Sequence, residues 1–396
     1  MKDTKRLFLI LAVANFFLYL GFNVWQASFN NFAVDELGVT ASQIGVIQAV
    51  REIPGLLGFL LGFLVLWFSE MRVMGISVLM LGVGLMIAGG AQGLGILLAG
   101  TLVMSIGFHF FYPSNQSIVL MEVDKRQAPQ VLGLLRSVSA SAAVVGTILV
   151  AVVVVGVEIG PISIPSWGYR TTFYVTGAVV VAGSFVTLLS GRRHGRQRQK
   201  RQIVFRRDYW LYYALTFMMG SRRHIFTTFA IFYLVDVFGL EVRWTALLFL
   251  ANSLVNTFAS AIFGVLVARF GERKMLTANF IGLIGVFLGY AFVPSLIFLC
   301  LLFVLDNIFF GFNLAVDSYF QKIAHSPEEI TSNVSMAQTI NHVSALIVPI
   351  LGGILWEQIS PSATFLAGVV IAIISLVLVQ FIRIRPTPLP LAIPSD

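Results

Sequence analysis

Polar and ionisable side chains recur along one face of four hydrophobic segments in this chain of 396 residues. The four segments, 7–32, 95–121, 209–236 and 296–323, are each separated from the next by two further hydrophobic segments. Helical geometry of about 100° per residue places the polar positions of each segment on one side of it. They are Asn15, Tyr19, Asn23, Gln26 and Asn30; Ser105, His109, Tyr112 and Gln116; Tyr212, Thr216, Arg223 and Thr227; and Asp306, Asn313 and Asp317. Polar groups inside a membrane normally face a bundle interior or a water-filled cavity, so this spacing predicts one central polar pathway.

The composition places these segments in a membrane. The chain is 58% hydrophobic and 11% charged, with a mean hydropathy of +0.89, whereas soluble domains carry about 25% charged residues. Runs of about 20 apolar residues are long enough to cross a bilayer as helices. The sequence therefore predicts an all-α membrane protein with twelve transmembrane helices, over residues 7–32, 41–66, 73–91, 95–121, 130–156, 168–190, 209–236, 242–268, 275–293, 296–323, 331–358 and 361–382.

The distribution of Lys and Arg predicts the orientation. Most of the 26 basic residues lie in cytoplasmic segments if both termini are cytoplasmic, as the positive-inside rule requires. The basic run 191–207 separates an expected N-terminal six-helix bundle (1–190) from a C-terminal one (209–396), with 191–208 as a basic cytoplasmic linker. A cytoplasmic loop that meets anionic membrane lipids explains this run without nucleic acid. We expect an integral protein of the inner (cytoplasmic) membrane of a prokaryote.

No motif indicates an enzyme. Cys300 is the only cysteine, which excludes disulfides and cysteine-rich metal sites. The glycine-rich stretch 89–95 lacks the flanking strand and the Lys-Ser/Thr of a phosphate-binding loop, so no ATPase motif is present. We expect no cofactor and no metal site, and energy from an ion gradient or from the substrate's own gradient.

Two parts of the chain repeat. GFLVLWFSEMR (62–72) is followed 202 positions later by GVLVARFGERK (264–274), and SIGFHFFYP (105–113) matches FFGFNLAVD (309–317) at a spacing of 204. Similar spacing across several elements indicates internal duplication. Secondary transporters are commonly built from such repeats and hold their substrate near the midplane between them.

The chain resembles the major facilitator superfamily over essentially its whole length. The resemblance is carried by six spans on either side of a basic loop and by a loop motif usually written G-x-L-x-D-R-x-G-R-R/K. The copy at 264–274 keeps Gly264, Leu266, Arg269, Gly271, Arg273 and Lys274 but has Ala268 in the Asp position. The resemblance implies two pseudo-symmetric six-helix bundles, transport by alternating access, and gating roles for Gly264, Arg269, Gly271 and Arg273. In the family the Asp helps to latch the outward-open state, so the question of a latch here stays open.

The charged residues within spans are candidates for the site. Arg222, Arg223 and His224 lie about halfway along 209–236, and only Arg223 lies on its polar face. The guanidinium groups of Arg222 and Arg223 could bind an anionic group of a substrate, or they could pair with Asp306 or Asp317. Asp306 could instead meet the cavity and carry a coupled proton, because a carboxylate near an Arg can release and take up a proton.

Other charged positions suggest contacts between the halves. Arg51 and Glu52 lie about 100° apart on a helix that the resemblance places between the halves, so we expect different partners and interdomain salt bridges for them. Arg136 and His342 occupy equivalent places in the repeat, and an ion pair at a gate is expected for Asp317. Because His titrates near neutral pH, His109 and His342 are alternative proton carriers.

These observations predict a monomeric, proton-coupled transporter of a small molecule with an anionic group. The expected substrate-binding residues are Asn23, Gln26, His109, Tyr112, Arg222, Arg223 and Asn313. Two alternatives stay open: a proton-driven exporter of hydrophobic or cationic drugs with Asp306 as the cation's partner, and a membrane assembly factor or sensor that keeps the fold without transporting. The sequence does not indicate the substrate, the direction of transport or the stoichiometry.

Overall fold

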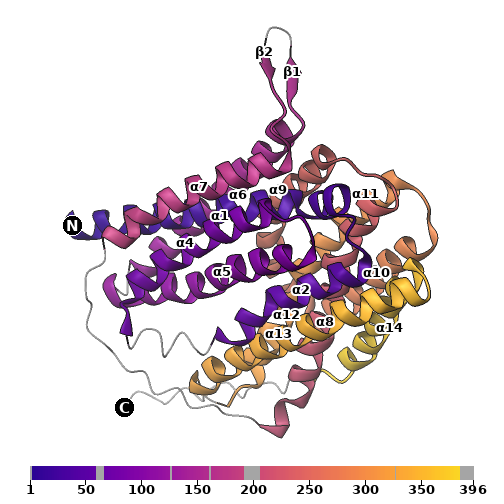
Figure 1. Cartoon of the computed structure of the whole chain (residues 1–396). Helices are drawn as coiled ribbons and strands as arrows, with labels where there is room; N and C mark the ends of the chain where they lie inside the picture. The colour runs from indigo at the N-terminus through magenta and orange to yellow at the C-terminus, as the bar shows by residue number, and fades with distance from the viewer. Residues whose placement is uncertain are drawn as a thin grey trace, which may run out of the picture.

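The computed structural model describes residues 2–58, 67–124, 127–159, 162–190, 206–325 and 327–383, and these are almost entirely helical (Figure 1). Apolar segments form helices in lipid because their backbone groups must be satisfied internally. The N-terminal half comprises α1 (Lys2–Leu37), α2 (Ala41–Leu56), α4 (Glu70–Gly89), α5 (Leu94–Glu122), α6 (Ala128–Leu149) and α7 (Gly168–Leu189). The C-terminal half comprises α8 (Trp210–Asp236), α9 (Val242–Phe270), α10 (Glu272–Phe292), α11 (Leu296–Phe310), α12 (Leu314–Ile323), α13 (Pro327–Gln358) and α14 (Pro361–Val379).

Each predicted span coincides with one helix or with one interrupted helix. The span 296–323 is divided into α11 and α12 by a 3₁₀ turn over Gly311–Asn313, and α6 ends in a π-helical turn over Val150–Val154. Nine helical segments of the described residues are long and apolar enough to cross a membrane. Helix α8 is not among them, because its Arg-Arg-His triplet at 222–224 lowers its hydropathy, and part of the span begun by α2 lies outside the described residues.

The start of α2 is determined by its capping residues. The Oγ1 of Thr40 accepts a hydrogen bond from the backbone N–H of Gln43 (3.4 Å), and the Oε1 of Gln43 accepts one from the N–H of Thr40 (3.1 Å). This capping box satisfies two donors that would otherwise be unpaired at the helix terminus. Gly38, with φ of +58°, makes the tight turn after α1. The cap therefore helps to set the direction in which Arg51 and Glu52 point, about three turns further along α2.

The two halves have equivalent helix packing, as the sequence repeat predicts. Helix α1 packs on α6 as α8 packs on α13, and α4 contacts α5 and α7 as α10 contacts α11 and α14. Gly146 on α6 and Gly352 on α13, at matching positions of the two halves, allow the close packing of α1 on α6 and of α8 on α13. A Cβ on Gly146 would lie 2.9 Å from the carbonyl oxygen of Leu20 in α1, and a Cβ on Gly352 would lie 2.4 Å from the ring of Phe229 in α8.

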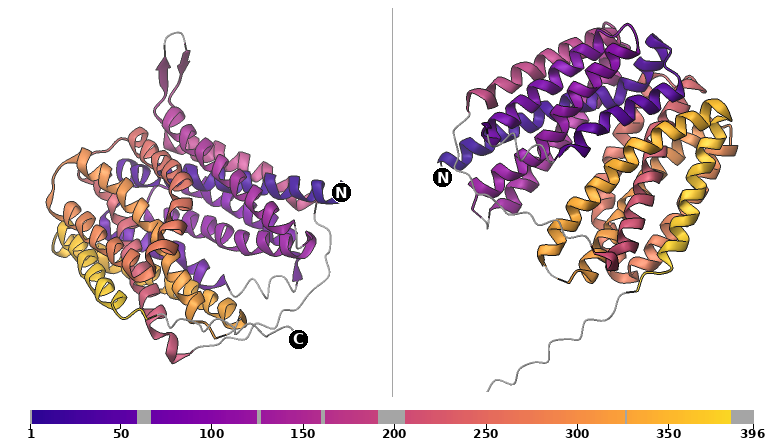
Figure 2. Two further views of the ribbon diagram at one scale, coloured as in Figure 1. Left: turned by 180° about the vertical axis from the view of Figure 1, so that it is seen from behind. Right: turned by 60° about the horizontal axis from the view of Figure 1, so that its bottom comes forward.

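The two halves meet through α2 on α13 and through α6 on α9. The N–H of Ser42 donates to Glu357 Oε1 (3.0 Å), and Asn31 Nδ2 donates to the carbonyl of Leu240 (2.6 Å). These residues lie at the end of the molecule opposite the N-terminus. Figure 2 (right) shows the helices of the two halves converging at one end and spreading apart toward the other, where α1 begins.

A short antiparallel hairpin, β1 (Val157–Ile159) and β2 (Ile162–Ile164), projects from the end of α6 and α7 (Figure 1). At its base, Arg243 Nη2 donates to the carbonyl of Gly156 (2.7 Å), which ties the hairpin to α9 of the other half. These strands lie in the loop expected between the spans 130–156 and 168–190, where no strand was predicted.

The close approach of α2 to α13 can be tested at Gly45. A Cβ there would lie 2.2 Å from the carbonyl oxygen of Pro349, so Gly45→Ala should force the two helices apart. Cysteines at Ser42 and Glu357, in a Cys300→Ala background, should cross-link readily, and Gly45→Ala should slow the cross-linking several-fold. Gly285→Ala is the matched control, because nothing lies within 4 Å of its added Cβ. Equal cross-linking in the two variants would contradict this packing.

Candidate functional site

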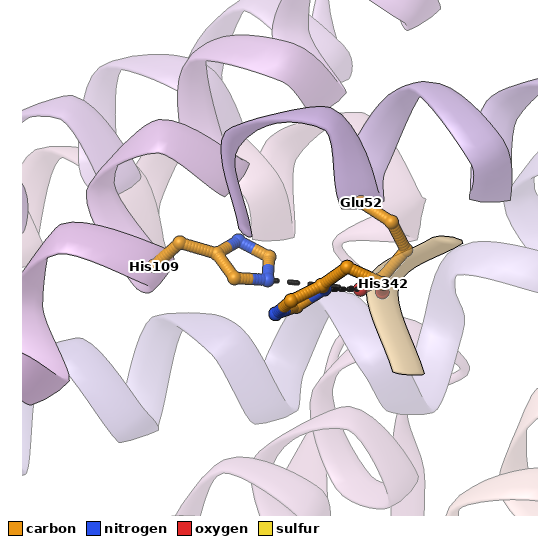
Figure 3. A group of neighbouring side chains, drawn as sticks. All are labelled: Glu52, His109 and His342. Atoms are coloured by element: carbon orange, nitrogen blue, oxygen red, sulfur yellow. Dashed lines mark hydrogen bonds and ion pairs between the residues drawn. The ribbon is translucent and has the colours of Figure 1, made fainter. Parts of the chain in front are cut away.

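Three ionisable side chains from three helices meet where the halves join (Figure 3). Glu52 lies on α2, His109 on α5 and His342 on α13, so one member comes from the C-terminal half. The Oε2 atom of Glu52 lies 3.0 Å from His342 Nδ1 and 3.7 Å from His109 Nε2. The two imidazole rings meet edge to face with 5.3 Å between their centroids. We refer to Glu52, His109 and His342 as the Glu–His–His cluster.

The cluster joins residues that the sequence analysis treated separately. Glu52 was expected to bridge the halves, and its contact with His342 is such a bridge. The repeat placed His342 opposite Arg136, but the structure puts the two in different surroundings. Arg136 is exposed on α6, whereas His342 is largely buried beside Glu52.

The expectation that Arg51 and Glu52 have different partners is wrong. Arg51 donates to Glu52 Oε1 through Nη2 (2.8 Å) and Nε (3.2 Å). Two long side chains can bend toward each other across the 100° that separates neighbouring helix positions. The Arg51 guanidinium also lies 5.6 Å from the ring centroid of the buried Trp25. As a result, Oε1 of Glu52 is held by Arg51, while Oε2 faces the two histidines.

The tautomer of neutral His109 follows from its contacts with Ser105. The Ser105 hydroxyl donates to the backbone carbonyl of Arg51, so its Oγ can accept a hydrogen bond. The Oγ and the carbonyl oxygen of Ser105 both lie 3.0 Å from His109 Nδ1. A carbonyl oxygen only accepts, so Nδ1 must carry the hydrogen. The other ring nitrogen, Nε2, then presents its lone pair toward Glu52.

Gly55 makes room for both imidazole rings. A Cβ at this position would lie 2.2 Å from His342 Cε1 and 2.7 Å from His109 Cδ2. Any side chain here would displace the rings from Glu52, which lies one turn earlier on α2. The sequence analysis did not identify Gly55, because its role depends on side chains from α5 and α13.

Asp306 pairs with Arg222 and not with Arg223. Arg222 Nη1 lies 2.5 Å from Asp306 Oδ1, and the two side chains are 1% and 7% exposed. The expected alternative in which Arg222 pairs with Asp306 is the one observed, whereas Asp306 is buried and does not bond to Arg223. The 100° step from residue 223 to 222 turns Arg222 away from the polar face and toward α11. Arg222, a predicted substrate contact, is occupied by this buried pair.

Arg223 makes no ion pair within the part of the chain that the structure describes. Its side chain is partly exposed, and its guanidinium lies 4.2 Å from the ring centroid of Phe310. A cation over an aromatic face gains part of the stabilisation that a carboxylate would supply. Glu52 and Asp306 lie within electrostatic range of this guanidinium but do not bond to it. Arg223 is therefore a partly exposed positive charge without a carboxylate partner among the described residues.

The predicted polar faces divide into two groups. Asn15 is buried, donates to Asn115 Oδ1 (3.2 Å) and accepts from Ser139 Oγ (3.2 Å). It therefore joins α1 to α5 and α6 and does not line a pathway. The predicted binding residues keep some exposure. They are Asn23 and Gln26 on α1, Tyr112 on α5 and Asn313 in the 3₁₀ turn. No structural contact tests their predicted role.

The loop motif at 264–274 borders a hollow of about 480 Å³ in the C-terminal half. Asp317 is exposed on its wall and forms no ion pair with any described residue, contrary to the expected gate pair. The ion pair at this hollow is formed by Glu272 and Lys322, with Ser318 donating to Glu272 (2.7 Å). Glu272 directly follows Gly271, so the motif contained a signal for it that the sequence analysis did not use.

The other motif residues shape the link between α9 and α10. Gly271 has φ of +82°, a conformation that favours glycine. Arg269 lies over the ring of Phe270 at 5.4 Å. Arg273 donates to Gln380 Oε1 through Nη2 (3.0 Å) and Nε (3.2 Å), which joins α10 to the end of α14.

Comparison with known proteins agrees with this architecture. A 137-residue stretch is 34% identical to an uncharacterised MFS-type transporter of Methanocaldococcus jannaschii, and the match spans about a third of that relative's length. The structure is similar to a bacterial homologue of the human lysosomal transporter Spinster in an inward-facing, occupied conformation, with a TM-score of 0.78, 14% identity, and 98% and 99% of the two chains covered. It is also similar to the nucleoside transporter NupG, with a TM-score of 0.73, 15% identity, and 94% and 97% covered.

The family model of the Major Facilitator Superfamily matches residues 11–329. Together with the apolar helices, this match confirms the predicted fold class of an all-α integral membrane protein built from two six-helix bundles. The chain belongs to the major facilitator superfamily.

Proposed function

We propose that this protein is a secondary-active transporter of a small molecule with an anionic group and works by alternating access. We place it in the inner membrane of a prokaryote, as a monomer with both termini in the cytoplasm. Membership of the family supports transport, and the basic loops support the orientation through the positive-inside rule. The described residues contain the two-half packing that alternating access uses.

The arrangement of the halves supports an inward-open state. The hydrogen bonds from Ser42 to Glu357 and from Asn31 to Leu240 join the halves at the end opposite the N-terminus. If the N-terminus is cytoplasmic, this joined end faces outward, and the helices spread apart toward the cytoplasm (Figure 2). A substrate would then reach the midplane from the cytoplasmic side.

Arg223 carries the proposal of an anionic substrate. A charged side chain near the centre of a membrane helix costs about 2.5–3.5 kcal/mol on insertion scales, and it is normally paired or functional. Among the described residues, Arg51 and Arg222 have carboxylate partners, whereas Arg223 lies over the Phe310 ring and forms no ion pair. A carboxylate or phosphate on the substrate would supply the missing negative charge through charge-assisted hydrogen bonds.

The contacts of Asp306 weigh against the two alternatives. A cationic drug would need a carboxylate that is free to pair with it, but Asp306 is buried and bonded to Arg222. An assembly factor or sensor that does not transport would have no reason to keep Arg223 without a partner. Transport of an anionic molecule accounts for both residues.

We assign proton coupling to Asp306, with His109 and His342 as the competing carriers. Protonation of Asp306 would release the Arg222 guanidinium from its buried position beside α11, and the freed side chain would have to turn toward the polar face to meet a substrate anion beside Arg223. Loss of the proton would re-form the pair and expel the anion. This exchange of partners links the proton to the substrate without requiring either charge to stay uncompensated.

Arg223→Gln should abolish transport and leave stability close to that of the wild type, because Arg223 has no ion pair to lose. Uptake is measured in proteoliposomes with a panel of radiolabelled small carboxylates and phosphates and their uncharged analogues. Arg222→Gln is the matched control. It should lower the free energy of unfolding by about 3–5 kcal/mol, because it leaves Asp306 buried without its partner. If Arg223→Gln is the less stable of the two variants, or transports normally, the assignment of Arg223 to the substrate is wrong.

Asp306→Asn should abolish accumulation driven by a pH gradient while substrate exchange at equal pH survives, since exchange requires no net proton movement. The same proteoliposomes report both activities. If the single variant is unstable, Asp306→Asn combined with Arg222→Gln removes both buried charges and restores a measurable protein. Normal accumulation in Asp306→Asn, together with its loss in His109→Gln or His342→Gln, would move the coupling role to a histidine.

A further inference from the structure

The Glu–His–His cluster has the donor set of a transition-metal site, although the sequence analysis expected no metal. Its three ligand atoms are Glu52 Oε2, His109 Nε2 and His342 Nδ1, and all lie within 4.8 Å of one another. Two imidazole nitrogens and one carboxylate oxygen, with a fourth position left open, form a common ligand set for zinc. We propose that this cluster binds one divalent transition-metal ion of the zinc class between the two halves.

The distances fit such an ion with small movements. In a tetrahedral zinc site, ligand atoms about 2.0–2.1 Å from the metal lie about 3.3 Å from one another. Here Oε2 of Glu52 lies 3.0 Å from one imidazole nitrogen and 3.7 Å from the other, values on either side of that separation. Figure 3 shows both rings directed at the carboxylate from opposite helices.

Two of the ligands are already oriented by further hydrogen bonds. Metal-binding histidines almost always donate their second N–H to an oxygen, and metal-binding carboxylates are hydrogen-bonded in turn. Ser105 accepts from His109 Nδ1–H, which leaves the Nε2 lone pair facing the cluster. Arg51 holds Oε1 of Glu52 and leaves Oε2 for the ion. Neutral His342 can present the lone pair of Nδ1 by moving its hydrogen to Nε2.

The surrounding charges predict which ions bind. Arg51 bonds to Glu52, and Arg223 on α8 lies within electrostatic range of it, so these positive charges oppose any cation. Hard ions such as Mg²⁺ and Ca²⁺ prefer several oxygen ligands and find one carboxylate here. Zn²⁺, Co²⁺ and Ni²⁺ gain affinity from imidazole nitrogen, so they should bind selectively.

The site would also join the halves. Glu52 and His109 belong to the N-terminal half and His342 to the C-terminal half, so one bound ion links α2 and α5 to α13. A ligand that binds only the folded, joined arrangement stabilises it by mass action. The ion would therefore hold the protein in the conformation described here.

The test uses the full-length protein, purified in detergent without a histidine tag and freed of metal. Cobalt chloride should give visible d–d absorption that saturates at one ion per chain, zinc chloride should displace it, and magnesium chloride should not. Glu52→Gln, His109→Gln and His342→Gln should each remove the signal, whereas His325→Gln should keep it. His325 is an exposed histidine that precedes α13 and lies outside the cluster. It therefore controls for metal binding to any accessible histidine.

Variants that leave all three ligands intact separate the site from general instability. Gly55→Ala places a Cβ against both imidazole rings and should abolish cobalt binding, while Gly58→Ala, with nothing within 4 Å of its Cβ, should not. Ser105→Ala should weaken binding about 10- to 100-fold, as loss of a ligand's supporting hydrogen bond does elsewhere. Zinc should raise the melting temperature of the wild type, of Gly58→Ala and of His325→Gln, but not that of Gly55→Ala or of the three ligand variants. No transported substrate is needed, so the outcome is independent of the transport proposal. Absence of saturable binding in the wild type, or binding that survives in the three ligand variants, would overturn the metal site.

Discussion

An unpaired charge inside a membrane is costly, and this constraint determines how the central helices of the protein meet. Glu52 receives Arg51 on one oxygen and faces His109 and His342 with the other, so α2 is joined to α5 and α13. In the C-terminal half, the ion pair of Asp306 and Arg222 neutralises both charges and joins α8 to α11. These pairs serve the structure first. Among the described residues, Arg223 lies in a membrane helix without a carboxylate partner, and by the same reasoning its charge is open to a ligand.

The fold was largely predictable because hydropathy and backbone chemistry lead to the same result. A long apolar run in lipid forms a helix, and every predicted span is helical in the structure where it is described. The features that escaped prediction depend on contacts across the molecule. The break between α11 and α12 includes Gly311, against which the ring of Phe263 packs so closely that an added Cβ would lie 2.2 Å from it. The hairpin after α6 lies in the loop expected between two spans, and its strands of three residues are too short for an alternating pattern to indicate them.

The sequence indicated which charged residues lie within the membrane helices, but it did not indicate which of them form ion pairs with one another. The helical period correctly separated Arg223 from Arg222, but it left the partner of Asp306 open between them, because a long guanidinium can reach a carboxylate on the adjacent helix from either position. The same reach lets Arg51 bond to Glu52 although they are neighbours in sequence. Glu52 and His342 are 290 positions apart, and nothing in either local sequence indicates their contact. The repeat related His342 to Arg136, since a repeat describes equivalent positions and not partners.

The location of each charge pair determines what the proposed cycle must break. Arg222 and Asp306 lie in the same half, so the movement of the halves as rigid bodies does not by itself part them, and in the proposed cycle only protonation of Asp306 does. The contacts between the halves at the joined end are close glycine packing and single hydrogen bonds, each worth about 0.5–1.5 kcal/mol. Separation of α2 from α13 also parts His342 from Glu52. Glu52 then keeps its bonds to Arg51, which belongs to its own half, so its charge is not left without a partner. A carboxylate with partners in both halves can therefore lose one of them during the cycle without an uncompensated charge in the membrane.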